Sequence, residues 1–127
     1  MDESVDAVQD TTALLKALSH RARLEIACIL GQGEACVCHL EAHLGYRQPY
    51  ISQQIMVLRK AGLVAERRDG TYVFYRLADP RVVILLESLK LKDKVRPRPS
   101  SSRHAACSCP HCAPERATGL SEDVGNA

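Results

Sequence analysis

The sequence predicts a mainly α-helical domain that carries a β-hairpin and is followed by a cysteine-rich tail. Three observations support this fold class. Apolar residues recur at helical spacing through most of the first 94 positions, an Asp69-Gly70 pair separates two β-rich runs, and the composition turns to Pro, Ser and small residues after Lys94. A chain of 127 residues is long enough for one domain with a modest core. We therefore expect a folded domain over residues 1–94 and a flexible tail over residues 95–127.

Two amphipathic helices are expected in the first thirty residues. Val8 and Leu14 mark the apolar face of the first helix, which should end near Ser19. Ser19 can in turn cap the second helix, because a serine hydroxyl accepts a hydrogen bond from the first turn. The second helix has a mostly apolar body that contains Cys28. A cysteine in such a run is most often a small buried hydrophobe, and the alternative is a redox-active thiol.

The stretch from Cys36 to Gly62 has the pattern of two helices joined by a turn. Gly45 should end the first of them, and Pro49 fits the first turn of the second, where its missing N–H is no loss. In the second helix Ile51 and Ile55 recur on one face, so polar side chains occupy the opposite face. Helix-turn-helix proteins place such a second helix in the major groove, where amides and hydroxyls can read base edges.

A β-hairpin follows this second helix directly, as the runs LVAERR and TYVFYRL on either side of Asp69-Gly70 indicate. A hairpin in this place is a wing. Between Arg47 and Arg81 there are seven Arg or Lys residues against three Asp or Glu, although the whole chain carries a net charge of only +2. Positive charge beside a reading helix suits DNA phosphates. The residues predicted to contact DNA are Gln48, Tyr50, Ser52, Gln53, Arg67, Arg68 and Arg76.

The runs ALSHRARLEIACIL, CVCHLEAHLGYRQPYISQQIMVLRKAGLV and RRDGTYVFYRL together resemble the ArsR/SmtB family of metal- and metalloid-responsive winged-helix repressors. The resemblance extends from Leu14 to Leu89 and includes the CVC-x-L pattern of the family's thiol-bearing helix. It implies a winged helix-turn-helix fold and a homodimer that binds a palindromic operator when empty and releases it on binding an inducer. The expected last helix, Arg81 to Lys92, supports dimerisation through an apolar stripe of Val82, Leu85, Leu86 and Leu89.

The six cysteines are read as ligands or redox thiols, because the chain shows no signal peptide and no apolar stretch that could span a membrane. We expect a cytoplasmic protein. Cys36 and Cys38 would diverge by roughly 200° on an ideal helix, so both can bind one ion only at a frayed or unwound helix start. Arsenic-responsive members have a third cysteine where this chain has Glu41. The tail motif C-S-C-P-H-C offers further thiols, namely Cys107, Cys109 and Cys112.

The predicted function is therefore a repressor released by a thiophilic ion at Cys36, Cys38 and the tail thiols, with As(III) favoured and Cd(II) or Pb(II) as alternatives. A redox or reactive-sulfur sensor would instead pair Cys28 with a tail cysteine. Some family members pair a cysteine at this point with one in the last helix, which here has none. A thiol-rich metal buffer without a DNA function is a third alternative. Enzyme motifs are absent, so neither catalysis nor a small-molecule substrate is expected.

Overall fold

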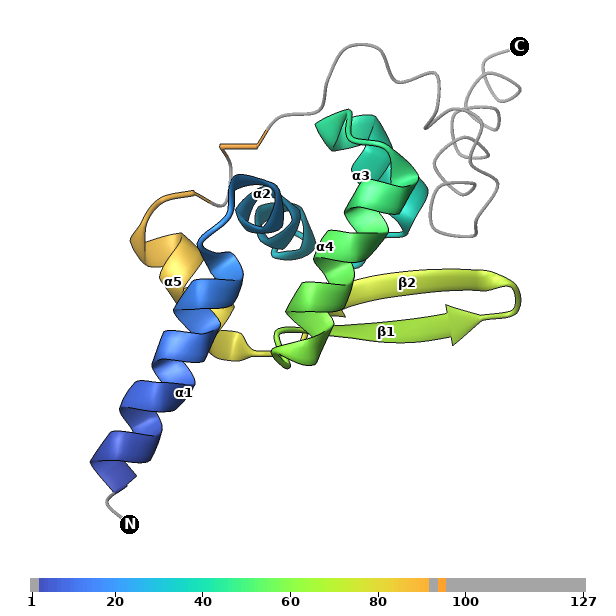
Figure 1. Ribbon diagram of the computed structural model, residues 1–127. Helices are drawn as coiled ribbons and strands as arrows, with labels where there is room; N and C mark the ends of the chain where they lie inside the picture. Colours follow the sequence, from blue (N-terminus) through green and yellow to red (C-terminus); the bar gives the residue numbers. More distant parts are fainter. Residues whose placement is uncertain (1–2, 92–93, 96–127) are drawn as a thin grey trace, which may run out of the picture.

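The structure is a computed structural model that describes residues 3–91 and 94–95, with the backbone alone for residues 3–5. The tail cysteines lie outside these described residues. Five helices and one two-stranded antiparallel sheet follow in the order α1 (Glu3–Leu18), α2 (Arg21–Leu30), α3 (Val37–Leu44), α4 (Gln48–Lys60), β1 (Val64–Asp69), β2 (Tyr72–Leu77) and α5 (Pro80–Ser88) (Figure 1). The prediction of a mainly helical winged helix-turn-helix is confirmed. None of the described helices is long and apolar enough to cross a membrane.

The first two helices form as expected, but the residue that caps α2 differs from the prediction. Ser19 directly follows α1, which ends at Leu18, and its N–H donates to the Lys16 carbonyl at 3.2 Å. His20 has the extended backbone of an N-cap, with φ −160° and ψ 129°, and its Nδ1 accepts from the Ala22 N–H at 3.2 Å. The assignment of the cap to Ser19 was wrong, because α2 begins at Arg21 and its N-cap position therefore falls on His20.

The helix-turn-helix unit agrees with its sequence pattern. Gly45 ends α3 in the left-handed region at φ 78°, and its N–H donates to the Glu41 carbonyl at 2.8 Å. Pro49 occupies the first turn of α4. Ile51 and Ile55 of α4 are buried against the helices before it, so α4 rests on α2 and α3 with its opposite side exposed.

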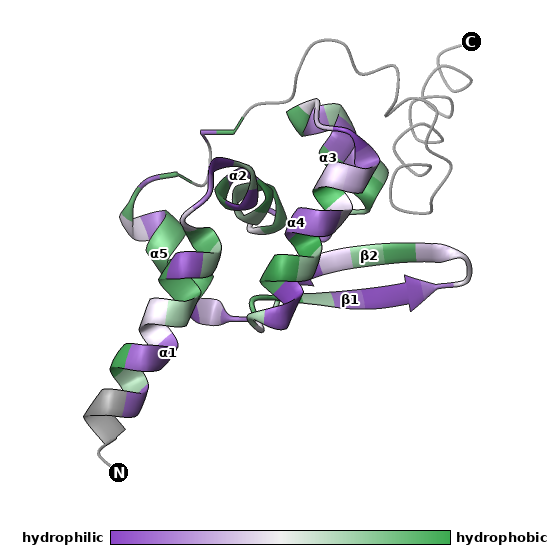
Figure 2. Cartoon of the chain, viewed as in Figure 1, coloured by the Kyte–Doolittle hydropathy of each residue, from purple (hydrophilic) through white to green (hydrophobic). Residues whose placement is uncertain are grey.

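The hairpin forms a wing that projects beyond the helices (Figure 1), and the outer half of β1 is strongly hydrophilic (Figure 2). Its register runs from Val64 opposite Leu77 to Asp69 opposite Tyr72. The two loop residues are therefore Gly70 and Thr71, one position later than the Asp69-Gly70 pair predicted from sequence. Gly70 adopts φ 64°, the conformation for which glycine is suited at a tight hairpin end.

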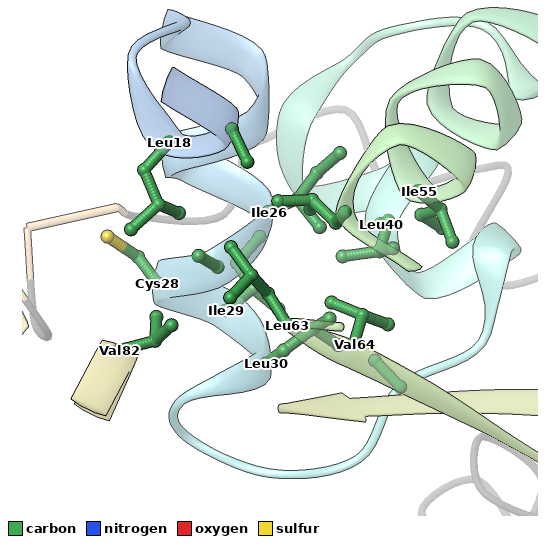
Figure 3. Close-up of a cluster of buried hydrophobic side chains, with 14 of the residues drawn as sticks. Leu18, Ile26, Cys28, Ile29, Leu30, Leu40, Ile55, Leu63, Val64 and Val82 are labelled. Atoms are coloured by element: carbon green, nitrogen blue, oxygen red, sulfur yellow. The ribbon is translucent and has the colours of Figure 1, made fainter. Parts of the chain in front are cut away.

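One hydrophobic cluster joins α1, α2, α3, α4, the start of β1 and α5 (Figure 3). The residues of the predicted apolar stripe on α5 differ in their burial in this core. Val82 and Leu86 are buried within the chain, Leu85 is partly buried against the same core, and Leu89 is 56% exposed. Ile84, which was not part of the predicted stripe, is 62% exposed. The helix ends at Ser88 and not at Lys92, and Lys90 just beyond it has a positive φ of 57°. An exposed apolar edge on α5 is what a helical dimer contact needs.

Candidate functional site

The exposed face of α4 presents the polar residues that the sequence predicted. Gln48, Ser52 and Gln53 are all exposed. Gln54, the next residue after Gln53, points the other way, is 8% exposed, and accepts a hydrogen bond from Arg23 Nη1 at 2.9 Å. Gln53 therefore faces solvent, whereas Gln54 joins α4 to α2 through its hydrogen bond with Arg23.

Tyr50 lies at the edge of this face and is 36% exposed. Its ring centroid lies 5.1 Å from that of Tyr46, in the turn before α4. The Tyr46 hydroxyl donates to Glu25 of α2 at 2.6 Å. This hydrogen bond, together with burial, raises the pKa of Tyr46. The first turn of α4 is consequently braced against α2 through an aromatic pair and a carboxylate.

The three predicted wing arginines divide into two kinds. Arg68 has a side chain that is 70% exposed, and Arg76 is also exposed, so both can meet a phosphate backbone. Arg67 donates from Nε and Nη2 to the two carboxylate oxygens of Glu34 at 2.9 and 2.7 Å. Its guanidinium carbon lies 4.8 Å from the centroid of the Phe74 ring. Arg67 therefore braces the wing in this structure, a role that its position in a basic run did not indicate.

The sulfur atoms of the two cysteines in the CVC motif converge. Cys36 is the N-cap of α3, with an extended backbone at φ −91° and ψ 169°, and Cys38 lies within the first turn. Their Sγ atoms are 3.0 Å apart. The roughly 200° divergence expected on an ideal helix does not apply, because Cys36 is the N-cap and stands just before the helix. Two soft donors that face each other suit a thiophilic ion.

Residues of the wing support this thiol pair, and sequence analysis missed them. Cys36 is 6% exposed and packs with Phe74 of β2, which is 1% exposed, while Cys38 and Tyr72 pack against both. Ala35 forms an isolated antiparallel bridge with Tyr75, by hydrogen bonds of 3.0 and 2.8 Å. Strand alternation indicated that Phe74 faces inward, but no local pattern identifies its partner 38 positions earlier in the chain.

Cys28 is buried at 2% exposure within the hydrophobic cluster (Figure 3). Burial, and next the charge of Glu25, raise the pKa of the Cys28 thiol. The thiol borders a cavity of about 360 Å³ between α2, α3 and the segment after α5, whose wall also includes His43 and Lys94. A thiol with a raised pKa is a weak nucleophile at neutral pH.

Within the described residues there is no group of three or more His, Cys, Asp or Glu side chains that could hold a metal ion. Cys36 and Cys38 can therefore supply two ligands, and the described part of the chain brings no third ligand to them. The other predicted ligands, Cys107, Cys109 and Cys112, lie outside the described residues.

Comparison with known proteins finds similarity to bacterial transcriptional regulators. A family model described as a bacterial regulatory protein of the arsR family matches residues 20–66. A biofilm growth-associated repressor from Agrobacterium fabrum is 51% identical over 80 residues, which cover 63% of this chain and 68% of that protein. An arsenical resistance operon repressor from Escherichia coli is 42% identical over 66 residues, 51% of this chain and 56% of that protein.

Two solved structures agree in fold. The transcriptional repressor BigR from Xylella fastidiosa has a TM-score of 0.64 at 39% identity and covers 68% of this chain and 89% of its own. A homodimeric winged helix-turn-helix DNA-binding domain from Mycobacterium bovis has a TM-score of 0.64 at 30% identity and covers 72% of this chain and 84% of its own.

Proposed function

Because this chain belongs to the ArsR/SmtB family of winged-helix transcriptional repressors, we propose that a thiophilic ion releases it from its operator, with As(III) the favoured inducer. The observation that carries this proposal is the 3.0 Å separation of the Cys36 and Cys38 sulfur atoms at the start of α3. The similarity to an arsenical resistance operon repressor supports the choice of As(III). Cd(II) and Pb(II) use similar ligands and are the alternatives.

The DNA-binding half of the proposal rests on α4 and the wing. In a homodimer the two α4 helices would enter successive major grooves about 34 Å apart. Ser52 and Gln53 would then read base edges, while Gln48 and Tyr50 contact the groove wall. Arg68 and Arg76 would neutralise phosphates of the flanking backbone. The exposed Ile84 and Leu89 of α5 are suited to the contact between the two subunits.

The sensing half uses thiolates. Cys36 and Cys38 would each lose a proton on binding the ion, so ion affinity should rise with pH toward the ordinary thiol pKa of about 8.5. As(III) takes three thiolates, and the third would come from Cys107, Cys109 or Cys112. Cys107 lies twelve positions after Val95 in the sequence, and a stretch of this length spans at most about 40 Å when extended. The ion and the operator favour different conformations, so each weakens binding of the other.

Fluorescence anisotropy of the reduced protein on DNA from its own promoter region tests this proposal. We expect As(III) to lower operator affinity, with Cd(II), Pb(II) and Zn(II) ranked by the same titration. Cys36→Ser should abolish the response, and removal of residues 95–127 should weaken it. Release of the Cys36→Ser variant by As(III) at the wild-type concentration would show that the CVC thiols are not the inducer site. Undiminished release of the truncated protein would exclude the tail thiols as ligands.

A redox sensor is the second candidate, favoured by the cavity at Cys28. Leu91, Lys94 and Val95 form one wall of this cavity, and the chain continues from there toward the tail cysteines. Oxidation would join Cys28 to a tail thiol as a disulfide, with two electrons and two protons passed to a peroxide that is reduced to water. The raised pKa of Cys28 would slow this reaction. Release by peroxide without metal, lost in Cys28→Ser and retained in Cys36→Ser, would establish this candidate in place of the first.

A further inference from the structure

The thiol pair is attached to the wing as well as to α3. The Ala35–Tyr75 bridge places the residue before Cys36 alongside β2, with both main-chain hydrogen bonds formed. The segment that leads into α3 thus extends the wing sheet by one short bridge on the free side of β2, opposite β1. Displacement of the Cys36 backbone would have to break these bonds or move β2 with it.

A second attachment lies in the side chains around this bridge. Cys36 and Phe74 are buried against each other, and Arg67, which is paired across the strands with Phe74, covers the Phe74 ring at 4.8 Å. The same Arg67 is joined to Glu34, two residues before Cys36, by two hydrogen bonds. Bidentate arginine–carboxylate pairs fix orientation as well as distance. These contacts link four residues, which we name the wing clasp: Glu34, Cys36, Arg67 and Phe74.

We propose that the wing clasp positions Cys36 and Cys38 and transmits binding of the inducer at these thiols to the wing. Inducer binding would then weaken the contacts of the wing with DNA. This inference rests on the proposed function and specifies its regulation. Cys36 is the N-cap of α3, and its carbonyl accepts from the Leu40 N–H at 3.2 Å. A change in its backbone would therefore act on the Ala35–Tyr75 bridge and on Phe74 as well as on the first turn of α3. Arg67 would then lose its present contact with the Phe74 ring and its hydrogen bonds to the Glu34 carboxylate. Arg68, the next residue on β1, would move with it relative to the phosphate backbone.

The alternative is that inducer binding at the thiols acts on the DNA-reading helix α4 through α3. α3 also packs against α4, so occupancy of the thiols could turn the reading helix and leave the wing in place. The four tyrosines of the chain distinguish these routes. Tyr72 and Tyr75 lie in β2, beside Cys36 and opposite Ala35, whereas Tyr46 and Tyr50 lie in the turn before α4 and in its first turn.

Fluorine NMR of the full chain labelled with 3-fluorotyrosine is the first test. Titration with As(III) should shift the Tyr72 and Tyr75 resonances, and Cys36→Ser should remove these shifts. Tyr→Phe variants assign the four signals. Shifts confined to Tyr46 and Tyr50 would assign the coupling to α4 and overturn the inference while leaving the proposed function intact. Absence of both As(III) binding and operator release in the wild type would overturn the proposed function, and the inference with it.

Glu34→Gln is the second test, because it weakens the wing clasp without removing a thiol or a core side chain. Ion binding, followed by the ultraviolet absorption of arsenic–thiolate bonds, should stay within about threefold of the wild type. The ratio of operator affinities without and with As(III) should fall at least about fivefold, the lower end of typical couplings. Glu66→Gln is the matched control, since Glu66 lies on the same hairpin and pairs outside the clasp, with Arg59 at 3.3 Å and with Arg68 at 4.0 Å. Because each ratio compares a variant with itself, a change in its operator affinity without As(III) does not by itself change the ratio. Equal ratios in Glu34→Gln, Glu66→Gln and the wild type would overturn the inference.

Discussion

Gln53 and Gln54 are adjacent residues of one type that α4 turns to opposite faces, so replacing each in turn with alanine should separate DNA reading from folding. Gln54 is 8% exposed and accepts from Arg23 Nη1 at 2.9 Å. A hydrogen bond to a charged donor contributes about 1.5–3 kcal/mol. Gln54→Ala should therefore lower the free energy of unfolding by about 2 kcal/mol. Gln53→Ala removes an exposed side chain and should change it by less than about 0.5 kcal/mol.

Operator binding should show the reverse order. If Gln53 reads a base edge, its removal costs about 1–3 kcal/mol per base contact, or roughly 5- to 150-fold in affinity. Gln54→Ala should bind close to wild-type strength at temperatures where it stays folded. Urea unfolding followed by circular dichroism at one fixed protomer concentration measures stability, since a dimer's stability depends on concentration. Wild-type operator affinity in Gln53→Ala, or equal stability decreases in both variants, would refute this arrangement of α4.

Three further predictions concern charge and protonation. Arg68→Gln should reduce the slope of log affinity against log salt by about 0.9 for each phosphate that Arg68 neutralises, and an unchanged slope in a potassium chloride series would remove Arg68 from the interface. Asp79 caps α5 by accepting from the Arg81 N–H at 2.9 Å, and Arg81 lowers the pKa of Asp79. Asp79→Ala should cost about 1 kcal/mol in urea unfolding at pH 7. Because the Asp79 pKa is lowered, this difference should shrink as the pH falls through the ordinary aspartate range, and a pH-independent difference would count against it. The raised pKa of Cys28 means less thiolate in the folded protein than in the unfolded chain. Iodoacetamide should thus alkylate Cys28 more slowly at pH 7.5 in the folded protein, as mass spectrometry can measure, and equal rates would contradict its burial.

Much of the fold was predictable because helix and turn signals are local. Gly45 ends α3 at the predicted residue, with the positive φ that glycine tolerates, and Pro49 lies in the first turn of α4. The errors lie where two local solutions compete. His20 and not Ser19 caps α2, and the hairpin loop begins at Gly70 and not at Asp69. These two are shifts of one residue, the scale on which competing hydrogen bonds decide an element's end. The larger error is the end of α5, which lies at Ser88, four residues before the predicted Lys92.

In the candidate site, too, local sequence patterns predicted some features, whereas others depend on contacts between distant parts of the chain. The exposure of Ser52 and Gln53 and the presence of two thiols near the start of α3 follow from periodicity and spacing, which the sequence by itself determines. The roles of other residues depend on partners far along the chain. Arg67 was predicted to contact DNA, yet it pairs with Glu34, which is 33 positions away. Helical and strand periodicity describe only neighbours within a few residues. Only the folding of the hairpin back over the start of α3 brings Phe74 against Cys36, so the tertiary structure alone decides that the thiols and the wing share one set of contacts.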